Sequence, residues 1–197
     1  MRSLRSFQVI AILLASLASN LHAQVRERDP LNKFSVTRPA SWTNEDRPSP
    51  AVRVILGFKG DGYAGGCNIS VLPSQSTARM SQAEVDASEN MRPLGIPFWQ
   101  SALRSVALDV KVLSESQTKR GPHFGHLIRY TYSYLSPSIQ QRVYLHAELF
   151  THSRPGKVFS FTCNTGALTA ADARSAFSNR GPSSFRVEPN SQNPWSS

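Results

Sequence analysis

Between residues 125 and 163, three runs of alternating side chains constrain the fold more than any other feature of this 197-residue chain. The alternation predicts three consecutive antiparallel strands over about 127–135, 142–152 and 157–163. Short gaps separate the runs, and consecutive antiparallel strands can be joined by such short connections. The stretch therefore indicates a three-stranded meander at the centre of a β-containing fold.

The apolar residues of the first two runs also predict how these strands pair. A slip of one residue would place apolar side chains opposite polar ones, so only one register matches the two patterns. That register sets Tyr130 against Ala147, Tyr132 against Leu145, and Arg129 against Glu148 on the other face. Tyr130, Tyr132 and Tyr134 could form a base-stacking platform in a nucleic-acid binder. In this register they are better interpreted as core residues.

The first 23 residues have the pattern of a secretory signal peptide. Arg2 and Arg5 precede an apolar segment over 9–18, and a small-residue cleavage site falls between Ala23 and Gln24. The apolar segment is too short to span a bilayer, and no other segment is long enough. No cysteine lies near the cleavage point, which argues against a lipid anchor. We expect a soluble periplasmic or secreted protein.

The charge of the chain is strongly basic but scattered. The formal net charge is +9; without Arg2 and Arg5, 20 Lys and Arg stand against 13 Asp and Glu, which leaves +7. This balance favours acidic partners or anionic surfaces. Nucleic-acid binders usually cluster their charge, whereas the longest basic run here is Lys119-Arg120. A solvated basic surface without nucleic acid is the favoured interpretation.

Cys67 and Cys163 are the only two cysteines. In an exported protein, two cysteines are most simply one disulfide. That bond would close a loop of about 100 residues and contribute roughly 4–5 kcal/mol on the chain-entropy model. A reactive thiol pair is the alternative, but the Cys-x-x-Cys spacing that tunes such pairs is missing.

The remaining pattern predicts one domain over residues 34–188. Residues 24–33 are polar and expected to be loose, and the tail 189–197 is expected to be disordered. Further strands are predicted at 34–42, 51–59, 63–72 and 110–117. A capping box, Ser81 with Glu84, predicts a helix that runs to about residue 90. Two further helices are predicted at 97–106 and after Thr169, where Asp172 occupies the box position.

No motif in the chain is a catalytic or cofactor signature. Residues 60–65 match G-x-G-x-x-G, but the residues that follow predict a strand rather than the helix a nucleotide site needs. His146 and His152 share a strand face roughly 20 Å apart, too far to bind one ion together. His123 and His126 share a turn, which leaves a weak surface metal site as an alternative. We expect no enzyme activity, no cofactor and no metal.

Several of these features together resemble the PsbP-like superfamily. The resemblance rests on Phe-Ser-Val-Thr-Arg-Pro-Ala-Ser-Trp over 34–42, the helix capped at Ser81, the meander, and the last helix leading to Ser184-Phe185. That superfamily includes an extrinsic photosystem II subunit, Ran-binding proteins and small exported bacterial proteins. The resemblance implies an α+β fold, an antiparallel sheet with helices on both faces. It also implies binding or assembly rather than catalysis.

One strand offers the best candidate surface for a protein partner. The alternate residues of the second run form a stripe of aromatic and charged side chains: Arg142, Tyr144, His146, Glu148, Phe150 and His152. Interfaces favour Tyr, Phe and Arg anchors in a polar surround. The alternative is that a helix covers this face and that Arg129 and Glu148 form only a cross-strand pair.

Three functions remain open at this point. The chain is interpreted first as an exported, non-enzymatic protein-binding or assembly module. The second interpretation is a periplasmic protein that binds a small ligand or a metal. The third is an enzyme whose site the sequence does not reveal.

Overall fold

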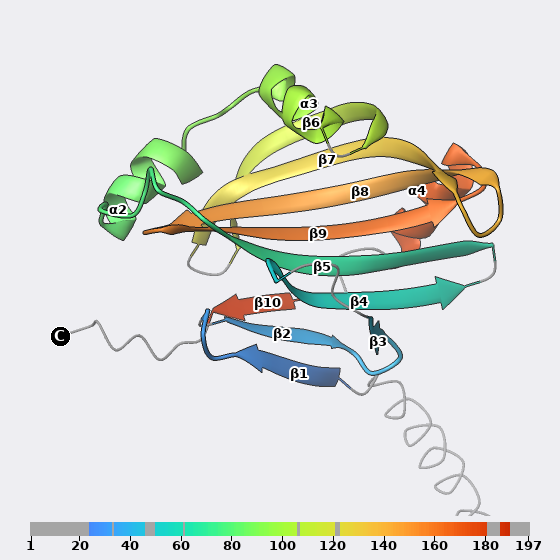
Figure 1. The fold of residues 1–197 in the computed structure, drawn as a ribbon, viewed down its shortest axis with the longest axis horizontal. Helices are drawn as coiled ribbons and strands as arrows, with labels where there is room; N and C mark the ends of the chain where they lie inside the picture. Colours follow the sequence, from blue (N-terminus) through green and yellow to red (C-terminus); the bar gives the residue numbers. More distant parts are fainter. Residues whose placement is uncertain are drawn as a thin grey trace, which may run out of the picture.

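The computed structural model describes residues 24–32, 34–45, 50–60, 62–105, 107–120, 123–180 and 186–189. The signal peptide and the residues after 189 lie outside these ranges, so the expectations for them stay predictions. The described strands form two antiparallel sheets (Figure 1). The large sheet has the order β3-β4-β5-β9-β8-β7-β6, and the small one the order β1-β2-β10.

The elements follow one another as two groups of strands with helices between and after them. The large sheet contains β3 (Thr43–Asn44), β4 (Val52–Gly60), β5 (Tyr63–Pro73), β6 (Leu108–Arg120), β7 (His123–Ser136), β8 (Gln141–Arg154) and β9 (Lys157–Ala167). The small sheet contains β1 (Gln24–Asp29), β2 (Phe34–Pro39) and β10 (Arg186–Pro189). The helices are α2 (Gln82–Val85), the π-helical turn η1 (Asp86–Asn90), α3 (Ile96–Arg104) and α4 (Ala170–Arg180).

The meander has the register predicted from its apolar pattern. Strand β7 pairs with β8 so that Tyr130 is opposite Ala147, Tyr132 opposite Leu145 and Arg129 opposite Glu148. Successive side chains of a strand point to opposite faces of the sheet. The odd residues of β8 therefore point to one face, and its even residues to the other.

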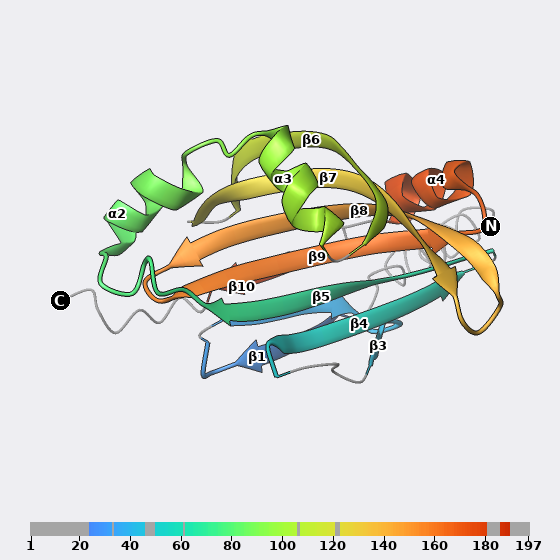
Figure 2. The same cartoon turned by 45° about the horizontal axis from the view of Figure 1, so that its top comes forward.

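Helix α3 packs on the first of these faces, which we call the α3 face (Figure 2). The buried side chains there form one apolar cluster. Its members are Trp99, Leu103, Val110, Val112, Ile128, Tyr130, Ala147 and Leu149. Tyr130 is only 7% exposed and Tyr132 packs against the cluster, as predicted for core residues, whereas Tyr134 is 43% exposed and lies outside the core.

The opposite face, which we call the β2 face, is covered by two different layers. Strand β2 packs over one part of it, and Phe177 of α4 contacts His146 near the other end, with 4.7 Å between ring centroids. The second apolar cluster lies here and consists of Phe34, Val36, Trp42, Leu56, Cys67, Ile69, Val71, Phe150, Phe159, Phe161 and Cys163. Helices thus lie on both faces, which confirms the α+β class.

The small sheet is the main difference from the architecture expected. Residues 24–29, expected to be loose, form β1 and pair with β2. Strand β10 pairs with the other side of β2. The polar sequence Gln-Val-Arg-Glu-Arg-Asp has no clear apolar face, so its pairing depends on β2 rather than on its own pattern. Two ends of the described chain therefore meet in one layer.

Helices α2 and α4 begin at the positions that their capping residues predicted. Ser81 Oγ accepts a hydrogen bond from the Glu84 amide at 3.3 Å, and the Glu84 carboxylate accepts one from the Ser81 amide at 2.7 Å. At α4, Thr169 Oγ1 accepts from the Asp172 amide at 3.1 Å. Among the described residues, no helix is long and apolar enough to cross a membrane.

Cys67 and Cys163 lie directly opposite each other in β5 and β9 and form a disulfide with an S–S distance of 2.01 Å. The two residues are 96 positions apart in the sequence. Both are buried in the cluster on the β2 face. The bond therefore joins the two halves of the large sheet, β3–β5 and β6–β9, at their shared seam.

We predict that labelling of the unfolded, unreduced protein finds no free thiol. Reduction, or replacement of both cysteines by alanine, should lower the free energy of unfolding by about 2–5 kcal/mol, because the unfolded chain regains the freedom of a long loop. Chemical denaturation with and without reductant measures this difference. Two labels per unreduced chain would contradict the bond.

Candidate functional site

The six residues of the predicted stripe share the β2 face but differ in exposure. Arg142 and Tyr144 are exposed, and His146 is partly covered. Glu148, Phe150 and His152 are buried, at 7%, 3% and 3% exposure. They therefore do not form the continuous exposed stripe that the sequence suggested as a partner surface.

The small sheet is the physical reason for this correction. Phe34 of β2 meets Phe159 edge to face, with ring centroids 6.3 Å apart, and Phe150 packs against Phe161 at 6.0 Å. The covering layer at this end of the face is thus a second sheet, whereas the alternative considered from the sequence was a helix. Among the described helices, α4 covers the other end of this face.

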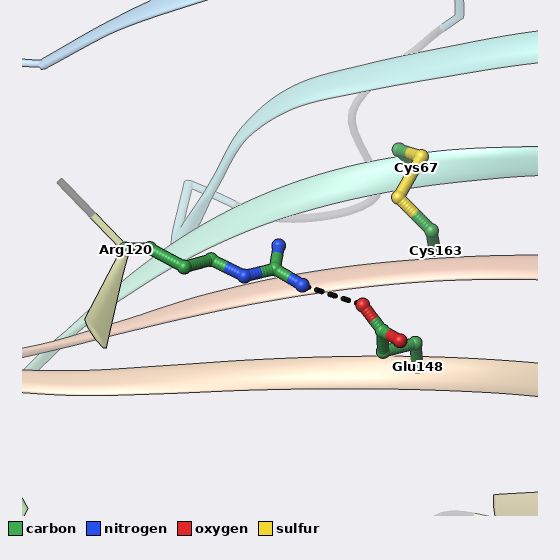
Figure 3. The surroundings of a disulfide bond; sticks show 4 residues. All are labelled: Cys67, Arg120, Glu148 and Cys163. Carbon is green, nitrogen blue, oxygen red and sulfur yellow. Dashed lines mark hydrogen bonds and ion pairs between the residues drawn. A yellow bond between two sulfur atoms is a disulfide. The ribbon is translucent and has the colours of Figure 1, made fainter. Parts of the chain in front are cut away.

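Glu148 marks the middle of the face, beside the disulfide. Its carboxylate accepts hydrogen bonds from Arg120 at 2.5 Å and from Arg129 at 3.1 Å, and it pairs in register with Cys163 (Figure 3). The predicted pairing of Arg129 with Glu148 is confirmed. Arg120 reaches Glu148 from β6, two strands away, which no local sequence pattern indicates. A buried carboxylate held by two arginines is a satisfied structural centre.

A groove of about 340 Å³ lies at the α4 end of the same face. We call it the basic groove, because its walls carry three basic side chains and one acidic one. These are Lys111 from β6, Arg142 from β8, Arg174 from α4 and, as the acid, Asp109. Tyr144 and His146 complete the wall on β8. The exposed half of the predicted stripe is therefore part of this groove.

The surroundings of His146 favour its neutral form. Burial lowers the pKa of its imidazole, and the positive charges of Arg174 and Arg129 lower it further. Its Nδ1 atom is buried without a hydrogen-bond partner among the described residues. The positive charge of the groove therefore comes from lysine and arginine, whose charges do not change near neutral pH.

A much smaller cavity, about 30 Å³, lies at the other end of the β2 face, where β8 ends and β9 begins. We call it the aromatic pocket. Its walls combine four phenylalanines with four basic side chains: Phe34, Phe150, Phe159, Phe161, Arg120, His123, His152 and Arg154. The ring of Phe150 lies over Gly125, where an added Cβ would sit 2.7 Å from the ring and would also collide with the Thr151 carbonyl.

The two histidines of this pocket hold one arginine. His152 Nδ1 donates to the Phe124 carbonyl at 2.7 Å, which leaves Nε2 to accept from Arg154 Nε at 3.4 Å. His123 Nε2 accepts from Arg154 Nη2 at 3.3 Å. The two imidazole rings lie 4.5 Å apart. Both histidines therefore act as neutral acceptors towards one guanidinium.

Burial is the main cause that lowers the pKa of His123 and of His152 to about 4. The neighbouring charge of Arg154 lowers both further, and for His123 so does His152. The spacing of His123 and His126 suggested that a turn brings these two together, and the contact of His123 with His152 was not predicted. Strand β7 begins four residues before the predicted start at 127, and extending the predicted register to residue 123 would have brought these residues together.

His126 points to the other face of the sheet. It contacts Glu115 at 3.1 Å through Nδ1 and the Glu89 carbonyl at 2.7 Å through Nε2. These contacts dock η1 onto β6 and β7. Within the described ranges, no three His, Cys, Asp or Glu residues are placed to hold a metal ion.

The comparisons with known proteins bear on the fold alone. No protein-family model and no curated protein sequence matches the chain. Among solved structures, cyanobacterial PsbP (CyanoP) from Synechocystis sp. PCC 6803 superimposes with a TM-score of 0.51 at 13% identity, over 86% of this chain and 95% of that one. LpqN of Mycobacterium tuberculosis, described as involved in cell envelope biogenesis, gives 0.47 at 14% identity, over 89% and 96%.

The class that this architecture defines is an antiparallel α+β sandwich. Its particular form is the PsbP-like fold, as the opening strand, the capped helix and the meander indicated. At this level of identity the likeness carries no site residue, ligand or partner from one protein to the other.

We predict losses of stability of very different size for two aromatic residues of the stripe. Phe150→Ala should lower the free energy of unfolding by about 3–5 kcal/mol, because it leaves a cavity in the cluster beneath β2. Tyr144→Ala should cost less than about 1 kcal/mol, since the side chain is exposed. Chemical denaturation of both variants tests this. Equal losses would contradict the burial described.

We also predict an acid-sensitive stability that comes from the aromatic pocket. The unfolded chain protonates its histidines below pH about 6.5, whereas His123 and His152 stay neutral in the folded chain until pH about 4. As far as these two histidines are concerned, the free energy of unfolding is therefore highest above pH 6.5 and decreases as the pH falls towards 4. For His152, the difference in pKa between the unfolded and the folded chain lowers the free energy of unfolding by about 3 kcal/mol at acid pH.

The control for this experiment is His152→Gln, which removes one titrating group. Between pH 7 and pH 4, the melting temperature of the variant should fall less steeply with pH than that of the wild type. Carboxylates are common to both proteins and cancel in the comparison. Parallel curves would show that His152 titrates normally.

Proposed function

We propose that this chain is an exported, non-enzymatic protein-binding module whose basic groove holds an acidic segment of a protein partner. The observation that carries the proposal is the combination of Lys111, Arg142 and Arg174 with exposed Tyr144 around one open groove. Arginine and tyrosine are the residue types that most often anchor interfaces.

The charges of the groove are available to a partner. Among the described residues, no carboxylate lies within ion-pair distance of Lys111 or Arg174. Arg142 contacts Asp109 at 2.6 Å, but both side chains are more than half exposed. Such surface pairs contribute little to stability, so Arg142 can exchange this contact for a partner's carboxylate. The groove therefore complements negative charge.

Two further features support a location outside the cytoplasm. The signal-peptide pattern over residues 1–23 supports export. The disulfide supports an oxidising compartment, because such bonds persist outside the cytoplasm. A periplasmic or secreted protein fits both.

Affinity capture from the native envelope fraction tests the proposal, with a photo-crosslinking residue at position 144 to mark the bound segment. The double variant Lys111→Glu/Arg174→Glu should reduce the crosslinked product at least tenfold. Capture by the wild type should also weaken as salt rises, because the attraction is electrostatic. Crosslinked peptides should be rich in Asp and Glu.

The matched control is Arg79→Glu/Arg104→Glu. It makes the same change in net charge at two exposed arginines outside the groove. If both double variants reduce capture equally, the attraction is a property of the overall charge and the groove is not the site. Crosslinks to neutral or basic segments would contradict an acidic partner.

A further inference from the structure

Among the described residues, Arg154 is the charged group of the aromatic pocket that has no anionic partner. Its contacts among the described residues are His123, His152 and the ring of Phe159, whose centroid lies 4.7 Å from the guanidinium carbon. No carboxylate of the described residues lies within ion-pair distance of it. The guanidinium is partly buried, and this burial lowers its pKa because it disfavours the charged form. A charge removed from water in this way is ordinarily paired.

The acidic residues nearby are already engaged. Asp86 influences both histidines electrostatically, but its carboxylate accepts from the side-chain amides of Gln82 and Asn90 at 2.9 and 2.7 Å. Glu148 is held by Arg120 and Arg129. The pocket thus contains more cationic than anionic groups, and the surplus is at Arg154.

The geometry of Arg154 suits a carboxylate. A guanidinium carries five N–H donors in a planar fork, and the two histidines engage one on Nε and one on Nη2. The remaining donors have no partner among the described residues, and Arg154 lines the cavity. Because the histidines accept through Nε2, they fix the plane of the fork without adding positive charge.

The size and walls of the cavity set the class of ligand. A volume of about 30 Å³ compares with the roughly 10–15 Å³ that one water molecule needs on this measure. The cavity therefore admits a group of only a few atoms. Four phenylalanines surround it, which favours a short apolar portion beside the charged end.

We propose that the aromatic pocket is a binding site for a small carboxylate, in which Arg154 binds the carboxylate and the phenylalanine rings enclose its methyl or methylene group. Acetate and propionate have this size and chemistry. So do the side chains of aspartate and glutamate, so a free acid or a protein side chain can supply the group. The pocket lies at the opposite end of the sheet from the basic groove, and this inference does not depend on the proposed function.

The first experiment compares propionate with propionamide, which has nearly the same shape and no charge. In NMR titrations of the wild type, propionate should give saturable shifts at the His123 and His152 rings and at Arg154 Nε. Its methyl protons should give NOEs to Phe159 or Phe34. A bound anion should also raise the pKa of both histidines, because it favours their charged form. Equal shifts with propionamide, or saturation without these NOEs, would overturn the proposal.

Variants separate the pocket from the general basic surface. Arg154→Gln should reduce propionate affinity at least tenfold, whereas Arg174→Gln, with the same loss of charge in the basic groove, should leave it unchanged. If Arg154→Gln does not fold, Arg154→Lys keeps the charge but loses the fork, and it should still weaken binding. Unchanged affinity in the folded Arg154 variant would refute the site.

Blocked amino acids distinguish between a free acid and a protein side chain as the source of the carboxylate. N-acetyl-glutamate amide, compared with N-acetyl-glutamine amide, presents the same group on a peptide backbone. Binding of the glutamate compound at the same resonances identifies a site for protein side chains; binding of propionate alone identifies a site for free small acids. Both support a carboxylate site. The double variant Lys111→Glu/Arg174→Glu should bind propionate with unchanged affinity. The carboxylate site can therefore be confirmed even where the proposed function of the basic groove fails.

Discussion

The pairing of β7 with β8 is the interaction on which the rest of the structure depends. Because side chains alternate along a strand, this register sends Ala147 and Leu149 towards α3 and sends Glu148 and Phe150 towards β2. A slip by one residue would drive the Glu148 carboxylate into the cluster around Trp99. The same register, continued into β9, brings Cys163 beside Glu148 and opposite Cys67. Core, ion pairs and disulfide therefore depend on one choice of pairing.

Features that depend on neighbours in the sequence or on strand alternation could be predicted. The register of the meander and the cap at Ser81 could be predicted because each follows from a local pattern. The cysteine pair could be predicted because the chain has only two cysteines. The burial of Phe150 and His152 could not. It depends on β2, whose Phe34 and Val36 join the Phe150 cluster from a distant part of the chain. In the small sheet, β2 pairs with β10 and with β1, and β1 has a polar sequence with no apolar face of its own.

The candidate sites show the same division. Arg142, Tyr144 and His146 were found because they share one strand, but Lys111 and Arg174 join them from β6 and α4. Their convergence arises only from tertiary packing, which no spacing in the sequence encodes. His123 and His152 are an intermediate case. Their meeting follows from the predicted register, provided that β7 is extended to its true start.

The close approach of Phe150 to Gly125 is only part of what keeps position 125 without a side chain. An added Cβ there would meet the Phe150 ring and would also collide with the Thr151 carbonyl. A smaller residue at 150 would therefore remove one wall of the aromatic pocket without making room at 125. As long as these two strands keep this arrangement, position 125 should accept only glycine, whatever residue stands at 150.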